Sequence, residues 1–370
     1  MHLILHIGAE KTGTKSIQQA LFQHEHALLR HSVLVPRSLR AWGHHAQLYS
    51  FFKGNAYSDD FFQLELKSSS PSSDSDSIVD RWKQAFETEI QASTAKQCIV
   101  TSEFLQSRLI DTEEIASLGE YLASHFESTH VVLYIRDQLE ATCSLVSTAL
   151  KGISGSYHSN HFPLPGTPEF EELGIDWKFD YKRVLESWTQ VFGQSCLSVR
   201  LYDRTLLRGG CVVKDFFFLC GLENNNFNHC SHLNRSLGAT GMALLSAFNK
   251  VTESDFKDHR WHEAKAFFAE VISVAFTNSR RYTPSSETQK RYTEFFSESN
   301  EWVRKNFFPE RERLFGNGEP RAEVDAANSF EIDPADSLDI AIAFKLILSH
   351  MATQSPSLTT TQPAQTQRIF

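Results

Sequence analysis

Residues 8–16 read Gly-Ala-Glu-Lys-Thr-Gly-Thr-Lys-Ser, and this stretch decides the expected fold. It follows the apolar run His-Leu-Ile-Leu-His-Ile at residues 2–7 and precedes a segment whose apolar residues have helical spacing. A turn of this kind between a strand and a helix is typical of phosphate-binding loops, and Gly13 lets the backbone approach a phosphate closely. In ATP-binding loops the lysine directly follows the second glycine, whereas Thr14 here separates Gly13 from Lys15. The stretch therefore predicts a phosphate-binding loop that differs from the ATP type.

Strand-like runs and helical patterns alternate along the chain beyond this turn. The strand-like runs are 2–7, 32–35, 97–101, 129–135 and 196–202. The clearest helical patterns are 14–29, 78–91, 112–126, 139–150, 181–192 and 210–220. Most of the strand-like runs are continuously apolar, as in strands that are buried on both faces. This order predicts an α/β fold with a central parallel sheet and helices on both faces, whose ligands bind at the carboxyl ends of the strands.

The composition of the chain predicts how it divides. We expect residues 1–352 to form a single α/β domain, in which the mainly helical part at 237–352 caps the sheet. Residues 68–77 are a polar, serine-rich insertion. Residues 353–370 contain too few apolar side chains to fold and are expected to be a disordered tail.

Charge and residue usage exclude several classes of function. The formal net charge of -9 does not favour nucleic-acid binding, and an anionic ligand needs a local basic pocket. The six cysteines show no Cys-x-x-Cys pair and are expected to be reduced thiols. The sixteen histidines show no metal-ligand spacing, so no metal site is expected. No run reaches the ~20 apolar residues of a membrane span, which predicts a cytoplasmic protein without stable membrane insertion.

Three motifs together resemble the sulfotransferases that use 3′-phosphoadenosine 5′-phosphosulfate (PAPS), and bacterial members in particular. They are Lys-Thr-Gly-Thr at 11–14, the run at 131–152 that begins Val-Val-Leu-Tyr-Ile-Arg-Asp, and the segment at 199–222 that begins Val-Arg-Leu-Tyr-Asp-Arg. The resemblance covers most of the chain up to about residue 309. It implies a P-loop-like sulfotransferase fold and an enzyme that uses PAPS and releases adenosine 3′,5′-bisphosphate (PAP).

The resemblance also implies roles for the residues of the turn. It places Lys11 at the oxygen that bridges sulfur and phosphorus in PAPS. The backbone N–H groups of residues 12–16, which include Thr12, lie at the positive end of a helix and can hold the 5′-phosphate. The hydroxyl groups of Thr14 and Ser16 are added donors. The family usually has Thr or Ser where this chain has Lys15, so the role of Lys15 stays open.

A second motif, Arg136 followed by Ser144, is implied to bind the 3′-phosphate of the nucleotide. A guanidinium and a hydroxyl at the end of a strand and on the following helix suit a dianionic phosphate. The alternative is that Arg136 pairs with Asp137 or Glu140 at the strand end and that Ser144 bonds to its own helix. Because relatives supply a basic residue from late in the chain, Arg235 is a further candidate contact to the nucleotide.

Three residues are candidates for the base that accepts the proton of the acceptor. Glu103 stands at the carboxyl end of the strand at 97–101, and burial can raise the pKa of a glutamate toward neutrality. His44 and His45 follow Lys11 by 33 and 34 residues, in the region where related enzymes place acceptor-side residues. An unperturbed imidazole titrates near pH ~6.5 and suits proton transfer. We expect Glu103 and one histidine, preferably His45, to line the acceptor site.

The function predicted from the sequence is transfer of a sulfuryl group from PAPS to a hydroxyl, or alternatively an amine, of a carbohydrate or glycolipid acceptor. The segments 37–80 and 152–177 are expected to set acceptor specificity. One alternative is a P-loop nucleotide kinase or ATPase, in which Glu103 would act with Mg²⁺, but this must explain the displaced lysine. Another is a non-catalytic nucleotide-binding or glycan-binding protein.

Overall fold

A computed structural model provides the three-dimensional structure of the chain. It describes residues 1–53, 61–63, 65, 75–152, 157, 159, 161–223, 237–252, 259–276, 279–316 and 330–354. The chain divides into two compact units. The first comprises Met1–Leu145, Pro163–Asn234 and Ser285–Asp325, and the second comprises Val146–Phe162, Arg235–Pro284 and Ala326–Phe370. Most of the expected insertion at 68–77 and of the expected tail at 353–370 lies outside the described residues. A single domain up to residue 352 stays a prediction.

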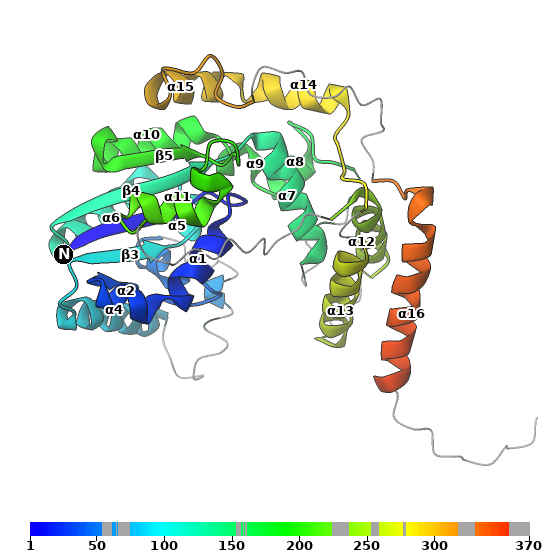
Figure 1. The fold of residues 1–370 in the computed structure, drawn as a ribbon, viewed down its shortest axis with the longest axis horizontal. Helices are drawn as coiled ribbons and strands as arrows, with labels where there is room; N and C mark the ends of the chain where they lie inside the picture. Colours follow the sequence, from blue (N-terminus) through cyan, green and yellow to red (C-terminus); the bar gives the residue numbers. More distant parts are fainter. Residues whose placement is uncertain are drawn as a thin grey trace, which may run out of the picture. The chain divides into compact units, whose positions relative to one another are not determined.

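The first unit is built on a parallel sheet. Among the described residues this sheet has five strands in the order β2-β3-β1-β4-β5, so that β1 lies in the middle (Figure 1). The strands are β1 His2–Gly8, β2 Val33–Leu34, β3 Gln97–Thr101, β4 Ser128–Ile135 and β5 Leu197–Leu201. The predicted α/β class with an all-parallel sheet is therefore confirmed.

Helices follow the strands in the order that the sequence predicts. The α-helices that are fully described in the first unit are α1 Thr14–Gln23, α2 Glu25–Arg30, α4 Ser75–Ala92, α5 Phe104–Arg108, α6 Thr112–His125, α7 Gln138–Lys151 (which continues into the second unit), α8 Pro168–Glu172, α9 Ile175–Lys178, α10 Tyr181–Phe192, α11 Val212–Leu219, α14 Ser286–Phe295 and α15 Ser297–Phe307. Its 3₁₀ helices are η1 Ala46–Phe51, η3 Gln194–Cys196 and η4 Arg208–Gly210. The single helix expected at 14–29 is two helices, because the backbone of His24 leaves the helical conformation.

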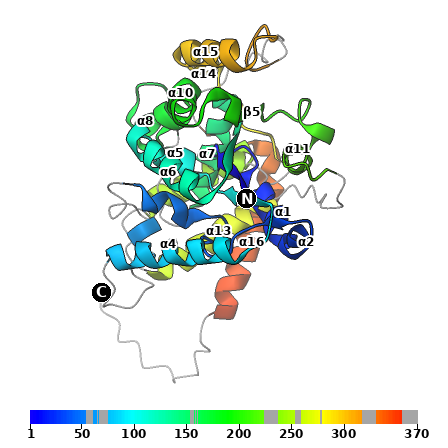
Figure 2. The same ribbon diagram turned by 90° about the vertical axis from the view of Figure 1, so that its left-hand side faces the viewer.

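Helices cover both faces of the sheet. Ile4, Val132 and Tyr134 lie in one buried cluster with residues of α1, α2 and α11. Helices α6 and α10 contact β4 from the opposite side (Figure 2). The strand residues alternate between these two apolar layers, which explains why most of the strand sequences are largely apolar.

The second unit is helical among its described residues. It contains α12 Ala239–Val251, α13 His259–Ala275, α16 Ser337–Gln354 and the 3₁₀ helix η6 Pro334–Asp336. The rings of Phe248 and Phe268 stack between α12 and α13, with centroids 4.3 Å apart. No helix in the described part of the chain is both long and apolar enough to cross a membrane.

The expectation that all six cysteines are reduced is wrong for at least one of them. Cys211, which caps the start of α11, is disulfide-bonded. Cys98, Cys196 and Cys220 are free thiols. The sequence analysis missed the disulfide because no short cysteine spacing marks it, and pairing between more distant cysteines depends on the folded backbone.

Candidate nucleotide and acceptor site

The turn after β1 contacts residues that follow two neighbouring strands. Glu103, after β3, lies so close to Gly8 that a Cβ on this glycine would be 3.1 Å from the Cα of Glu103. On the other side, Nη1 of Arg136, after β4, donates a hydrogen bond to the carbonyl of Lys11 at 3.2 Å. The carboxyl ends of three adjacent strands therefore meet at this turn, where parallel sheets bind their ligands.

Three residues of the turn, Gly8, Lys11 and Gly13, have φ angles in the left-handed region. Gly13 has a φ of 80°, and a Cβ there would lie 2.9 Å from both the Tyr202 ring and a methyl carbon of Val212. Only glycine fits this position without displacing a neighbour. Lys11 has a φ of 66°, which is uncommon for a residue with a side chain and costs about 1–2 kcal/mol. The carbonyl of this strained lysine is the one that accepts the bond from Arg136.

Helix α1 begins at the turn with an uncapped N-terminus. Gly13 offers no side-chain cap, and the first turn of α1 contains no acidic residue. The N–H of Ser16 bonds to the carbonyl of Gly13 at 3.0 Å, whereas the helix itself supplies no acceptor for the N–H groups of Thr14 and Lys15. The hydroxyl of Thr12 donates to a carbonyl within the turn at 2.6 Å and so stabilises its shape. The positive end of α1 thus presents N–H groups that suit an anion.

The guanidinium of Arg136 is shared between the turn and α7. Its Nε and Nη2 donate to Oε2 of Glu140 at 3.2 and 2.9 Å. The pairing that the sequence allowed as an alternative therefore occurs, but together with the contact to Lys11. Ser144 lies one helical turn beyond Glu140 on the same face of α7. Binding of the 3′-phosphate by Arg136 and Ser144 stays a prediction, and Arg235 lies outside the described residues.

Glu103 is the centre of a polar cluster. Nε2 of Gln18, on α1, donates to Oε2 of Glu103 at 2.5 Å. Nδ1 of His44 lies 3.7 Å from the same oxygen and 3.0 Å from the hydroxyl of Ser102. Burial lowers the pKa of His44 although the charge of Glu103 acts to raise it, so the ring is neutral near pH 7. A carboxylate and a neutral imidazole that lie side by side can each accept a proton.

His45 has a different environment from His44. The N–H of Thr101 donates to Nδ1 of His45 at 2.9 Å, so Nε2 carries the proton and donates to the carbonyl of Pro36 at 2.9 Å. The ring is fully buried, and this burial lowers its pKa to about 3. Both ring nitrogens are used in bonds to the backbone. The geometry thus brings His44, and not the preferred His45, to Glu103.

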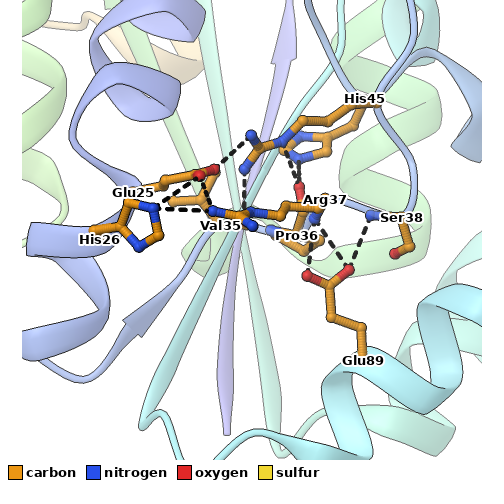
Figure 3. A network of polar contacts seen from close by, with 9 residues as sticks. Glu25, His26, Val35, Pro36, Arg37, Ser38, His45 and Glu89 are labelled. Carbon is orange, nitrogen blue, oxygen red and sulfur yellow. Dashed lines mark hydrogen bonds and ion pairs between the residues drawn. The ribbon is translucent and has the colours of Figure 1, made fainter.

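Carboxylates from two helices hold the segment at residues 35–45, which carries both histidines (Figure 3). Glu89 of α4 accepts the backbone N–H of Arg37 at 2.9 Å. Glu25 of α2 pairs with the guanidinium groups of Arg37 and Arg40, the latter at 2.5 Å. These contacts fix the position of the segment relative to α2 and α4.

The sequence analysis missed two cations near the turn. Nζ of Lys178, at the end of α9, lies 3.8 Å from Oε1 of Glu10. Burial of Glu10 acts to raise its pKa. The charges of Lys178, Lys11 and Arg108, together with a hydrogen bond from Ser107, outweigh burial and hold that pKa below its usual value. Arg108 could have been found, because it ends the short helix that begins after Glu103. No pattern in the sequence connects Lys178 with the turn.

Lys15, whose role the sequence left open, is exposed in the first turn of α1. Its positive charge is close enough to His44 to contribute to the lowered pKa of that ring. Lys15 therefore lies on the side of the turn that faces His44.

Comparisons with known proteins give two matches. No family model matches the chain. Over 141 residues the chain is 26% identical to an uncharacterized protein of Archaeoglobus fulgidus. The aligned region covers 34% of this chain and 38% of that protein, which is well under half of either. Among solved structures, the chain matches a sulfotransferase from Alicyclobacillus acidocaldarius with a TM-score of 0.36 and 11% identity, over 70% of this chain and 97% of that one. Similarity at this level carries no conclusion about activity.

Proposed function

We propose that the chain is a PAPS-dependent sulfotransferase that moves a sulfuryl group to a hydroxyl of a carbohydrate or glycolipid and releases PAP. The observation that carries the proposal is the turn after β1. In it a strained Lys11 precedes the left-handed Gly13 that opens α1, and Arg136 from the neighbouring strand bonds to the lysine carbonyl. The resemblance of the sequence motifs to PAPS-dependent enzymes supports the choice of donor.

The donor would bind along the carboxyl edge of the sheet. In this proposal the N–H groups at the start of α1 hold the 5′-phosphate. Arg136 and Ser144 hold the 3′-phosphate. Arg136 would exchange its bonds to Glu140 for bonds to the phosphate, because a guanidinium makes paired hydrogen bonds to either group.

Transfer would proceed by in-line attack of the acceptor hydroxyl on sulfur. The bond from the acceptor oxygen to sulfur forms while the bond from sulfur to the bridging oxygen breaks, so negative charge develops on the departing 5′-phosphate. Lys11 stabilises this charge, which is larger in the transition state than in the bound donor. Glu103, oriented by Gln18, takes the proton of the hydroxyl, and the neutral His44 beside it is the other candidate base.

Nucleotide preference tests the donor part of the proposal. By calorimetric titration, PAP should bind more tightly than AMP or ATP by ~1.5–3 kcal/mol, the contribution of a charge-assisted contact to the extra phosphate. Arg136→Ala should remove most of this preference. Glu140→Gln is the matched control, because it leaves the guanidinium in place and should retain the preference. Equal affinity of the parent protein for PAP and AMP would contradict the proposal.

Removal of divalent metal ions by a chelator distinguishes a sulfotransferase from the alternative, a P-loop kinase. Because Lys11 and backbone N–H groups supply the positive charge, release of PAP from PAPS in the presence of a glycolipid extract should continue when EDTA is added. A P-loop kinase needs Mg²⁺ and would lose its activity. Turnover that the chelator abolishes would favour the kinase.

A further inference from the structure

Residues 41–44 form a tight turn in the segment that carries His44. Ala41 and His44 exchange two backbone hydrogen bonds, of 2.9 and 3.0 Å. The two central residues, Trp42 and Gly43, have φ angles of 53° and 82°. Positive φ at both central positions is the pattern of a type I′ turn, which favours Asn, Asp or Gly at the first of them. This chain has a tryptophan there, in a conformation that bulky residues avoid.

The indole of Trp42 is half exposed and lies next to the proposed base. Its exposed fraction is 51%. The indole packs edge-on against Phe61 and Phe104, with centroids 5.0 and 6.2 Å apart. The ring of His44 packs perpendicular to the same Phe104 at 4.5 Å, and Phe104 directly follows Glu103. Trp42 and the pair of Glu103 and His44 therefore border one aromatic cluster.

Packing alone does not explain a tryptophan at this position. Tyr49 and Phe61 are fully buried in the same cluster, whereas about half of the larger Trp42 side chain is open to solvent. Backbone strain persists only where the surroundings hold it, and it gathers at ligand sites. Here the surroundings do hold it, because His45 bonds to Thr101 and Pro36 directly after the turn.

We propose that Trp42 is the platform on which the acceptor stacks, and that the acceptor is a pyranose sugar with an apolar C–H face. This inference rests on the proposed function. The exposed indole offers a flat π surface to the sugar ring. Beside it, Glu103, His44 and Arg108 can bond to the sugar hydroxyls, and Cζ of Arg108 lies 3.7 Å from the Phe104 ring centre. The alternative is a phenolic acceptor, which would need an enclosing apolar pocket.

Sulfation rates of defined acceptors at saturating PAPS test this role. The acceptors are methyl β-D-glucopyranoside, methyl β-D-galactopyranoside, cellobiose and 2-naphthol. For the best sugar, Trp42→Asn should lower kcat/KM about tenfold, mainly through KM, because stacking is lost. Trp42→Phe should keep most of the activity. Phe295→Asn, which changes an equally exposed aromatic residue on α14, is the control and should leave the acceptor KM unchanged.

PAP affinity and the thermal midpoint distinguish a failure of this inference from a failure of the proposed function. Trp42→Asn should bind PAP as the parent does, and its thermal midpoint should not fall, because relief of the left-handed strain offsets the lost packing. The inference is overturned if the acceptor KM is unchanged in Trp42→Asn. It is also overturned if the enzyme transfers sulfate to 2-naphthol alone or to no sugar. In each case, PAP binding by the parent protein would still support the proposed function. If the parent protein does not bind PAP, the proposed function fails, and this inference fails with it.

Discussion

The two sides of the candidate site are built in different ways. The proposed donor side is the turn at residues 8–16, in which glycine conformations and helical N–H groups would provide the binding surface. The proposed acceptor side is made of side chains that come from distant parts of the chain: Gln18, His44 and Glu103. A phosphate can be held by local backbone geometry, whereas a proton acceptor is defined by its neighbours and its burial. The donor side is therefore visible in a short motif and the acceptor side is not.

Both sides nevertheless contain a strained residue with a side chain. Lys11 on the donor side and Trp42 on the acceptor side have φ angles of 66° and 53°. Each is held by contacts from β3 or β4 or from the segments that follow these strands. This shared feature agrees with the proposed roles of both side chains, because backbone strain gathers at ligand sites.

The largest expected effect is on the acceptor side. Glu103→Gln keeps the size of the side chain but removes its ability to take a proton, so we expect kcat to fall by roughly 10²–10⁴-fold. PAP affinity should be unchanged, because the donor is bound by the turn. Single-turnover transfer and calorimetric titration measure the two quantities. A loss of less than about tenfold would assign the proton to His44.

The next largest effect is on the donor side. Lys11→Ala should lower kcat by roughly 10²–10³-fold, because its charge acts mainly in the transition state, while PAP affinity stays within a few-fold of the parent. Lys15→Thr is the matched control and should keep most activity, since Lys15 is exposed. The same two measurements apply. If Lys15→Thr loses activity and Lys11→Ala keeps it, the catalytic cation is the other lysine.

Alanine substitutions at Gly13 and Gly43 test how tightly the backbone is packed on each side of the site. Gly13→Ala should destabilise the fold by roughly 2–4 kcal/mol, because the new Cβ adds a clash with Tyr202 and Val212 to left-handed strain. Gly43→Ala has a similar φ but no atom within 4 Å of the Cβ, so strain alone should cost about 1–2 kcal/mol. Urea unfolding of both variants measures the difference. Equal costs would show that the Gly13 neighbours move freely.

The last expected effect is a pH dependence of stability. Burial lowers the pKa of both His6 and His45 to about 3. The unfolded chain takes up these protons below pH ~6.5 and the folded chain does not, so stability is complete above that pH and falls toward pH ~3. Each histidine contributes a slope of about 1.4 kcal/mol per pH unit. Urea midpoints measured between pH 7 and pH 4 should fall less steeply for His45→Asn than for the parent. Equal slopes for His45→Asn and the parent would show that His45 takes up its proton at the same pH in the folded and the unfolded chain.

Local patterns in the sequence were sufficient for the class of fold and for the donor turn. The apolar runs predict β3 and α10 with the bounds that the structure has, because hydrophobic period and turn residues act within one element. The spacing of Lys11 and Gly13 likewise predicted the turn, because glycine adopts the positive φ that a tight turn requires. These inferences needed no knowledge of which segments meet in space.

The tertiary structure alone decided which side chains surround Glu103. His44 and His45 are adjacent and chemically identical, but one ring meets Glu103 and the other is fixed between Pro36 and Thr101. The choice depends on how the segment at residues 35–45 lies against β3, which is more than fifty residues away in the chain. Lys178 reaches Glu10 from still further along the chain. Burial and charge neighbours arise only when such segments pack together, and no local pattern in the sequence records that packing.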